Sequence, residues 1–184
     1  MFHVFVLIVF IICGFLSAGD AFAQTSGAPQ QARQLAASLD KTKYKHKAKK
    51  NFEFELYIDI KNEVVVKNIA DYAGVYESPD SGYRVELRIS GGKIEGSGYE
   101  TNYENSSRVD FTLRDARIEG ALLTADRVYA DDTTKRLEAV FVNRTITQGA
   151  NPNKIKSREM KFGLGFVENF GETSQNRVFC EYKP

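Results

Sequence analysis

Residues 83–99 read YRVELRISGGKIEGSGY. From Tyr83 to Ile89, apolar side chains alternate with charged ones, which is the pattern of a β-strand with one buried face and one solvated face. The segment Ser90–Lys93 supplies the two adjacent glycines that a tight hairpin turn favours, and a second strand over Ile94–Tyr99 follows it. This hairpin indicates an antiparallel sheet.

The same two-residue period recurs along the rest of the chain. Short segments rich in Gly, Pro, Asp and Asn separate the periodic runs, and no long amphipathic helix lies between them. This arrangement excludes βαβ units. We therefore predict an all-β fold, either an antiparallel up-and-down barrel or a strongly curled sandwich of eight or nine strands. The further runs are 52–60, 109–113 and 160–166.

The N-terminal residues resemble a signal peptide. Phe2 to Leu16 are almost all apolar, and Ala21-Phe22-Ala23 follows as a small-x-small cleavage site. We expect cleavage after Ala23 and a periplasmic or secreted location. An uncleaved anchor is the alternative, but the apolar run is shorter than the ~20 residues that span a bilayer. No membrane span is expected after cleavage.

The mature chain divides into two parts. Residues 24–50 form a basic N-terminal arm, in which 24–31 are expected to be disordered and 32–39 to form a short helix. Residues 51–184 form a single β-barrel-like domain, a size that supports one core. We expect a monomer or a weak dimer, because exposed edge strands of an incompletely closed barrel can pair across a two-fold axis.

Six lysines fall within residues 41–50, and several of them alternate with Tyr44, His46 and Ala48. In a strand this spacing places a row of cations on one face, which would suit an anionic envelope component such as a lipid headgroup. The alternative is an edge strand whose lysines prevent aggregation. The overall charge near neutrality argues against nucleic acid as a partner. The candidate residues for the anionic partner are Lys43, Lys45, Lys47, Lys49 and Lys50.

Common enzyme motifs are missing from the sequence. The mature chain has one histidine, His46, and one cysteine, Cys180, so a zinc site of His and Cys ligands cannot form within it. No nucleophile elbow, P-loop or dinucleotide fingerprint is present. We expect no cofactor, no metal and no enzymatic activity. A carboxylate-based hydrolase is the less favoured alternative, because such pairs meet only in the fold. Cys180 alternates with Val178 and Tyr182, which predicts a buried, inert thiol.

The segment Asp71-Tyr72-Ala73-Gly74-Val75-Tyr76-Glu77 opens the regular array of strands. It resembles the Tyr-x-Gly-x-Tyr-Glu start of small exported bacterial β-barrel modules of lipocalin-like, calycin-type shape. The resemblance covers about 25 residues, because the hairpin that follows lies where such modules place theirs. It implies a barrel in which Tyr76 closes one end, and it implies no catalytic residue.

The function we expect is that of a non-enzymatic binding module. A barrel of about eight strands is either filled by side chains or holds one small ligand. If a small apolar or amphipathic ligand occupies it, the inward apolar strand faces would line the site. The alternative is an envelope protein with a filled barrel that acts through its surface and its basic arm. The candidate lining residues are Phe54, Leu87, Phe111, Phe141, Phe162 and Leu164.

Overall fold

The computed structural model describes residues 27–39, 43–48, 52–78, 81–102, 105–149, 155–170 and 174–183. Within these residues the chain is antiparallel β-sheet with one short α-helix, as the sequence predicts. The apolar N-terminal segment and its expected cleavage site lie outside the described residues. No helix in the described part of the chain is both long enough and apolar enough to cross a membrane.

The described residues contain ten strands, one α-helix and one 3₁₀ helix. The helices are α2 (Gly27–Leu39) and η1 (Ile69–Tyr72). The strands are β1 (Lys43–Ala48), β2 (Phe52–Glu63), β3 (Gly74–Ser78), β4 (Tyr83–Ser90), β5 (Lys93–Thr101), β6 (Arg108–Glu119), β7 (Leu122–Tyr129), β8 (Thr134–Gly149), β9 (Ile155–Phe170) and β10 (Ser174–Lys183).

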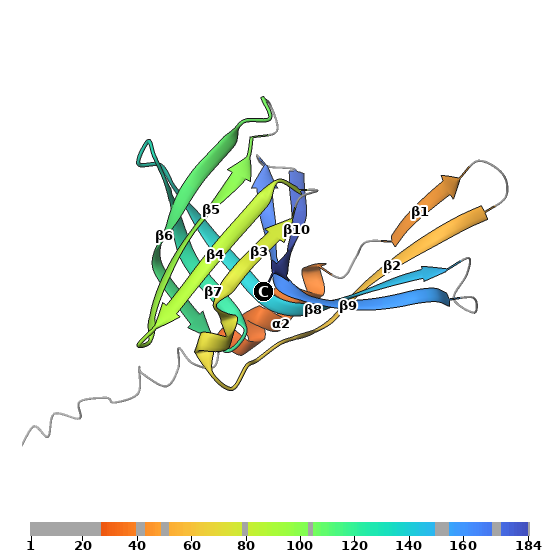
Figure 1. Cartoon of the computed structure of the whole chain (residues 1–184), viewed down its shortest axis with the longest axis horizontal. Coiled ribbons are helices and arrows are strands. Elements are labelled where there is room, and N and C mark those ends of the chain that lie inside the picture. The colour runs from red at the N-terminus through yellow and green to blue at the C-terminus, as the bar shows by residue number, and fades with distance from the viewer. Residues whose placement is uncertain are drawn as a thin grey trace, which may run out of the picture.

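Eight of the strands, β3 to β10, close into an up-and-down barrel (Figure 1). Of the two predicted folds, the barrel is therefore confirmed and the curled sandwich is not. Each strand pairs with the next one along the chain, and β10 pairs with β3 to complete the ring. This last pairing is short. It joins Val75 to Lys183, Tyr76 to Tyr182 and Glu77 to Glu181.

The four-stranded sheet that we call the wing extends from the barrel (Figure 1). It consists of residues 43–48, 52–60, 144–149 and 155–161. Strand β8 belongs to both parts, because its residues 134–140 pair with β7 whereas 142–149 pair with β2 along the same edge. Strand β9 follows β8 through both parts. The wing is therefore an extension of two barrel strands and was not part of the predicted fold.

The hairpin over residues 83–99 forms as the sequence predicts. Ser90 pairs with Lys93, and Gly91 and Gly92 occupy the two turn positions with φ of 57° and 80°. A positive φ at both positions is the requirement of a type I′ turn, which matches the twist of the flanking strands. The buried face of β4 carries Tyr83, Val85 and Leu87, which point into the barrel.

An aromatic cluster fills one end of the barrel, next to η1. Tyr72 stacks on Phe141 with ring centroids 3.9 Å apart, and Phe141 in turn lies 6.2 Å from Phe162. Tyr76 and Tyr182 complete the cluster. The hydroxyl groups are bonded to backbone, since Tyr76 donates to the carbonyl of Tyr72 at 2.6 Å and the Tyr72 hydroxyl lies 2.7 Å from the carbonyl of Val64. We call this region the aromatic end.

The helix α2 packs on the outer face of the barrel. It buries Ala28, Ala32, Ala36 and Leu39, and the Leu39 side chain lies against Gly165 of β9. A larger residue at position 165 would occupy the space of Leu39. The helix begins at Gly27, so residues 27–31 are helical and the expectation of disorder there is wrong. The small side chain of Ala28 packs closely against the barrel, and this tertiary contact outweighs the weak propensity of the segment.

The strand glycines accommodate neighbouring side chains. A Cβ atom at Gly98 would come within 2.7 Å of the Phe111 ring, and one at Gly96 within 2.6 Å of Leu113. A Cβ atom at Gly163 would come within 2.6 Å of the Phe179 ring. The space on the Cβ side of these glycines is therefore filled by the chain itself.

Candidate functional site

A charged network lies inside the barrel at the end opposite the aromatic end. Arg127 of β7 is only 3% exposed and contacts one carboxylate on each side. Its Nη1 donates to Oε2 of Glu100 on β5 at 2.8 Å, and its Nη2 donates to both carboxylate oxygens of Glu168 on β9 at 2.9 Å. Three strands that are far apart in the sequence thus meet through one guanidinium.

Aromatic rings surround this network. The Arg127 guanidinium carbon lies 5.9 Å from the centroid of the Phe111 ring, and Phe111 packs edge-on against Tyr129 at 6.0 Å. Tyr83 packs edge-on against Phe166 at 5.3 Å. These rings leave the pair of Arg127 and Glu168 little access to water, and low polarity around paired charges strengthens their attraction.

Burial and charge determine the protonation states in the network. Burial raises the pKa of the Tyr83 and Tyr129 hydroxyls well above the ordinary value, and the carboxylates of Glu100 and Glu168 add to the rise. Both phenols are therefore neutral near pH 7. Burial acts to lower the pKa of Arg127, but its hydrogen bonds to Glu168 and the charges of both carboxylates outweigh burial and raise it. The guanidinium stays charged.

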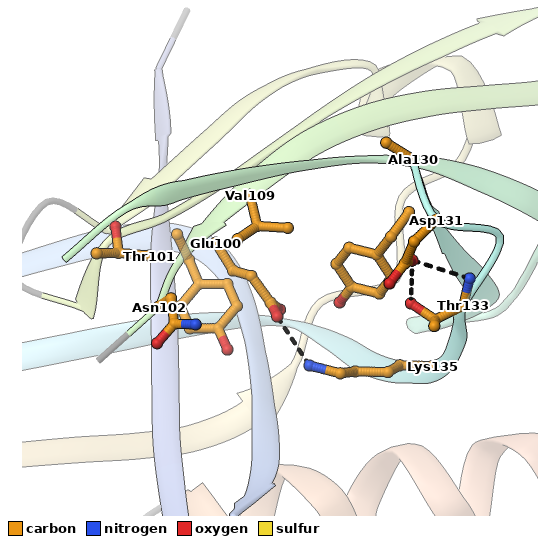
Figure 2. Close-up of a pocket in the computed structure, with 10 residues that line it drawn as sticks. Glu100, Thr101, Asn102, Val109, Ala130, Asp131, Thr133 and Lys135 are labelled. Atoms are coloured by element: carbon orange, nitrogen blue, oxygen red, sulfur yellow. Dashed lines mark hydrogen bonds and ion pairs between the residues drawn. The ribbon is translucent and has the colours of Figure 1, made fainter. Parts of the chain in front are cut away.

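The network lies beneath a pocket at the open end of the barrel, which we call the mouth. The pocket has a volume of about 580 Å³, within the usual range for small-molecule sites of roughly 300–1,000 Å³. Figure 2 shows Glu100 directed toward Lys135, with the hydrogen-bonded pair Asp131 and Thr133 beside them. The residues that line the mouth are Tyr83, Glu100, Thr101, Asn102, Val109, Tyr129, Ala130, Asp131, Thr133 and Lys135.

Two polar groups at the mouth have no hydrogen-bond partner among the described residues. They are the hydroxyl of Tyr129, a residue 7% exposed that lines the pocket, and the Nε of Arg127 beneath it. A buried polar group without a partner costs about 1–3 kcal/mol, so native structures rarely leave one empty without a reason. The hydroxyl of Tyr129 is closed to solvent beside the carboxylate of Glu100, so a molecule in the mouth reaches it only when a neighbouring side chain of the wall moves.

The chemistry that this arrangement allows is binding through hydrogen bonds and charge. The described residues contain no group of three or more His, Cys, Asp or Glu side chains placed to hold a metal ion. Both interior carboxylates are already paired with Arg127, which leaves neither of them in the apolar, unpaired setting of a general acid.

The predicted ligand-lining residues lie mainly in the packed core. Leu87, Phe111, Phe141 and Leu164 are buried and point into the barrel, where Phe141 belongs to the aromatic end. Phe162 is partly buried beside Phe141, so these five residues fill the interior. None of the five lines the mouth. Phe54 lies in β2 opposite His46, and its side chain is outside the described set.

The predicted basic segment lies partly in the wing. Lys43, Lys45 and Lys47 belong to β1, whereas Lys49 and Lys50 fall outside the described residues. The register places Lys45 opposite Glu55, and Lys47 opposite Glu53. Opposite charges at directly facing positions stabilise an antiparallel pair, so this register supports the interpretation of β1 as a protected edge strand.

The sequence argument missed the charged network, although part of its signal was present. Glu168 follows Leu164 and Phe166 in the same two-residue phase, so alternation alone places it on the buried face. Arg127 follows Leu123 and Ala125 in the same way. A charged residue in phase with a buried apolar run indicates an interior ion pair. The weaker case is Glu100, whose phase-mates Gly96 and Gly98 carry no side chain.

Cys180 is fully buried, as the sequence predicts. Burial, together with the charge of Glu77, raises the pKa of the Cys180 thiol to about 12. Because the thiolate is the reactive form, a thiol with this pKa is inert at neutral pH.

No protein family, curated protein or solved structure matches this chain. The assignment of a function therefore depends on the geometry of the mouth and of the wing.

Proposed function

We propose that this chain is an exported binding module that holds one small amphipathic ligand at the mouth of its barrel. The Tyr129 hydroxyl is the observation that carries the proposal, because it is buried, unpartnered and part of the pocket wall. The apolar segment Phe2–Leu16 supports export. The lipocalin-like opening over residues 71–77 agrees with a barrel that binds a small molecule.

The packing of the interior determines where such a ligand sits. The aromatic end is filled by side chains, and Phe111 and Leu113 occupy the space beside Gly98 and Gly96 of β5, so a ligand does not enter deeply. Its polar group meets Tyr129 and the charged network, while its apolar part lies along the rings of the mouth and Val109. Amphipathic ligands fit such a site better than purely apolar ones.

Native mass spectrometry of the exported chain tests this proposal. We expect a mass above that of the bare chain, which disappears on denaturation. The Tyr129→Phe variant removes only the hydroxyl and should weaken the affinity for the ligand about tenfold, the effect of about 1.4 kcal/mol, which lowers the occupied fraction. Tyr99→Phe is the matched control, because the Tyr99 hydroxyl donates to Glu77 outside the mouth. A bare mass for the wild-type chain contradicts the proposal.

A second candidate function rests on the wing. The wing is a four-stranded sheet that extends beyond the closed ring, which suits a surface that contacts an envelope component. Under this proposal the chain binds anionic lipid or glycan through β1. Replacing Lys43, Lys45, Lys47 and Lys49 by Gln should abolish salt-sensitive binding to anionic vesicles. Wild-type chain that does not bind, or a variant that binds equally well, contradicts it.

A further inference from the structure

The ammonium group of Lys135 sits in the mouth in a position suited to a cation. Its Nζ donates to Oε1 of Glu100 at 2.9 Å and lies 5.1 Å from the centroid of the Tyr129 ring. A carboxylate on one side and an aromatic face within about 6 Å are the two features with which proteins recognise alkylammonium groups. The chain thus places one of its own ammonium groups in a cation site.

The two sides of this ion pair differ in exposure. The Glu100 side chain is 11% exposed and is held from behind by Arg127, whereas the Lys135 side chain is 54% exposed. The carboxylate is therefore a fixed part of the wall, and the lysine is the mobile partner. A half-exposed lysine can leave for solvent at little cost, because its ammonium is well hydrated there and an ion pair with an exposed partner is weak.

The charges around the mouth favour a cation over an anion. Without Lys135, the mouth and the network beneath it hold one cation, Arg127, and three carboxylates, those of Glu100, Glu168 and Asp131. The carboxylate of Asp131 accepts hydrogen bonds from the side chain and backbone of Thr133, which lower its pKa and keep it ionised. A ligand ammonium that replaces the one of Lys135 leaves this balance unchanged, whereas an anion would meet net negative charge.

The Tyr129 hydroxyl is the second observation that points to a ligand. It is buried in the pocket wall and has no partner within the described chain, although the Lys135 ammonium lies over its ring. A phenol oxygen accepts as well as donates a hydrogen bond. An ammonium that enters between Glu100 and Tyr129 can donate to both oxygens, which the tethered lysine does not do.

We propose that the mouth binds small primary alkylammonium ligands, and that Lys135 is a built-in occupant which the ligand displaces. This inference rests on the proposed function and names the head group of its ligand. The ligand ammonium takes the place of the Lys135 ammonium against Glu100 and donates to Tyr129, while the alkyl chain lies on Tyr83 and Val109. Lys135 moves into solvent. The exchange forms and breaks hydrogen bonds only.

The Lys135→Met variant tests the displacement directly. Methionine keeps an unbranched apolar stem and removes the ammonium, so the competitor is lost and the wall remains. If Lys135 occupies the site about nine-tenths of the time, its removal should tighten binding about tenfold. The probe is n-butylammonium, titrated against the folded chain while the backbone amide resonances of Thr101, Ala130 and Thr133 are followed by NMR. Lys183→Met is the matched control, since Lys183 is a half-exposed lysine paired with Glu181 elsewhere.

Two further probes fix the charge of the head group. Butyrate and 1-butanol have similar alkyl chains but an anionic and a neutral end, and both should bind at least about tenfold more weakly than n-butylammonium to Lys135→Met. Equal binding of the three probes, or tighter binding of butyrate, overturns the proposal. So does a Lys135→Met variant that binds n-butylammonium no more tightly than the wild type and Lys183→Met do.

A measurement on the unaltered chain gives an independent test. In protein with ¹³C-labelled lysine, n-butylammonium should shift the side-chain resonance of Lys135 toward that of a solvated lysine and leave that of Lys183 in place. Saturation of the mouth with no change at Lys135 overturns the displacement. If no amine binds while native mass spectrometry still detects a ligand, the cation assignment fails and the proposed function stands. A bare mass is the outcome that removes the proposed function itself.

Discussion

The two ends of the barrel both contain aromatic rings, but they differ in the hydrogen bonding of the tyrosine hydroxyls. At the aromatic end, the hydroxyls of Tyr72 and Tyr76 are bonded to backbone carbonyls, and the rings stack without a gap. At the mouth, the hydroxyl of Tyr129 has no partner in the described chain and the interior is held by the ion pairs of Arg127. One end is closed by the chain alone, whereas the other is the end at which we propose that a ligand binds.

The largest effect is expected from breaking the charged network. Arg127→Met should reduce the free energy of unfolding by about 4 kcal/mol, because it leaves Glu168 buried without its cation. Urea unfolding followed by circular dichroism measures this loss. Arg84→Met is the control, since Arg84 pairs with Glu86 on the outer surface and should change stability by less than about 1 kcal/mol. Equal losses in the two variants would contradict the structural role of the network.

At the aromatic end, the equivalent change is Phe141→Leu. It should cost about 2 kcal/mol, because it removes part of the buried apolar area and the stacking against Tyr72. The same urea experiment measures it. Met160→Leu should be close to neutral, since Met160 is an exposed residue of the wing. The stacking argument fails if Phe141→Leu unfolds at the same urea concentration as the wild type.

A pair of Tyr→Phe variants compares the two ends most directly. Tyr72→Phe removes a hydroxyl bonded to the backbone and should cost about 1.5 kcal/mol, whereas Tyr129→Phe removes a buried hydroxyl without a partner and should raise stability by about 1–3 kcal/mol. Thermal and urea unfolding of both variants provide the comparison. If Tyr129→Phe loses as much stability as Tyr72→Phe, the hydroxyl at the mouth has a partner within the chain.

The buried thiol adds a pH dependence to the stability of the barrel. The pKa of Cys180 is raised from its ordinary value of 9.0 to about 12, so the folded chain keeps this proton while the unfolded chain releases it. Stability must therefore fall as the pH rises above 9. By pH 10 the stability lost through this group is on the order of 1 kcal/mol. Cys180→Ala should show a smaller loss between pH 8 and pH 10 than the wild type, and parallel curves would exclude the effect.

Much of the barrel could be predicted from alternation, because each strand needs only to bury one face. The runs that contain Val85, Phe111 and Leu164 predicted strands that the structure confirms, and the glycines after Ser90 predicted the hairpin. Alternation is a local signal. It places Arg127 and Glu168 on the inward face, but the closure of the ring decides that they meet.

Two features lay beyond any local pattern. Strand β8 changes its neighbour from β7 to β2 after Val140, and its sequence continues as one strand through this point. The helix α2 begins at Gly27 because Ala28 finds a surface on the barrel, not because residues 27–31 favour a helix on their own. The mouth also could not be predicted from a local pattern, since its wall comes from loops and strand ends that only the barrel brings together.

The pairing of β3 with β10 has a consequence for the order of assembly. All other neighbours in the ring are joined by short connections, but this seam joins residues 75–77 to 181–183 through only three register pairs. Contacts between distant parts of a chain form late, because the entropy lost in closing the long loop is repaid only when they are complete. The chain therefore has to complete the meander from β3 to β10 before the ring can close, and Tyr76 and Tyr182, which face each other across the seam, join the aromatic end in that last step.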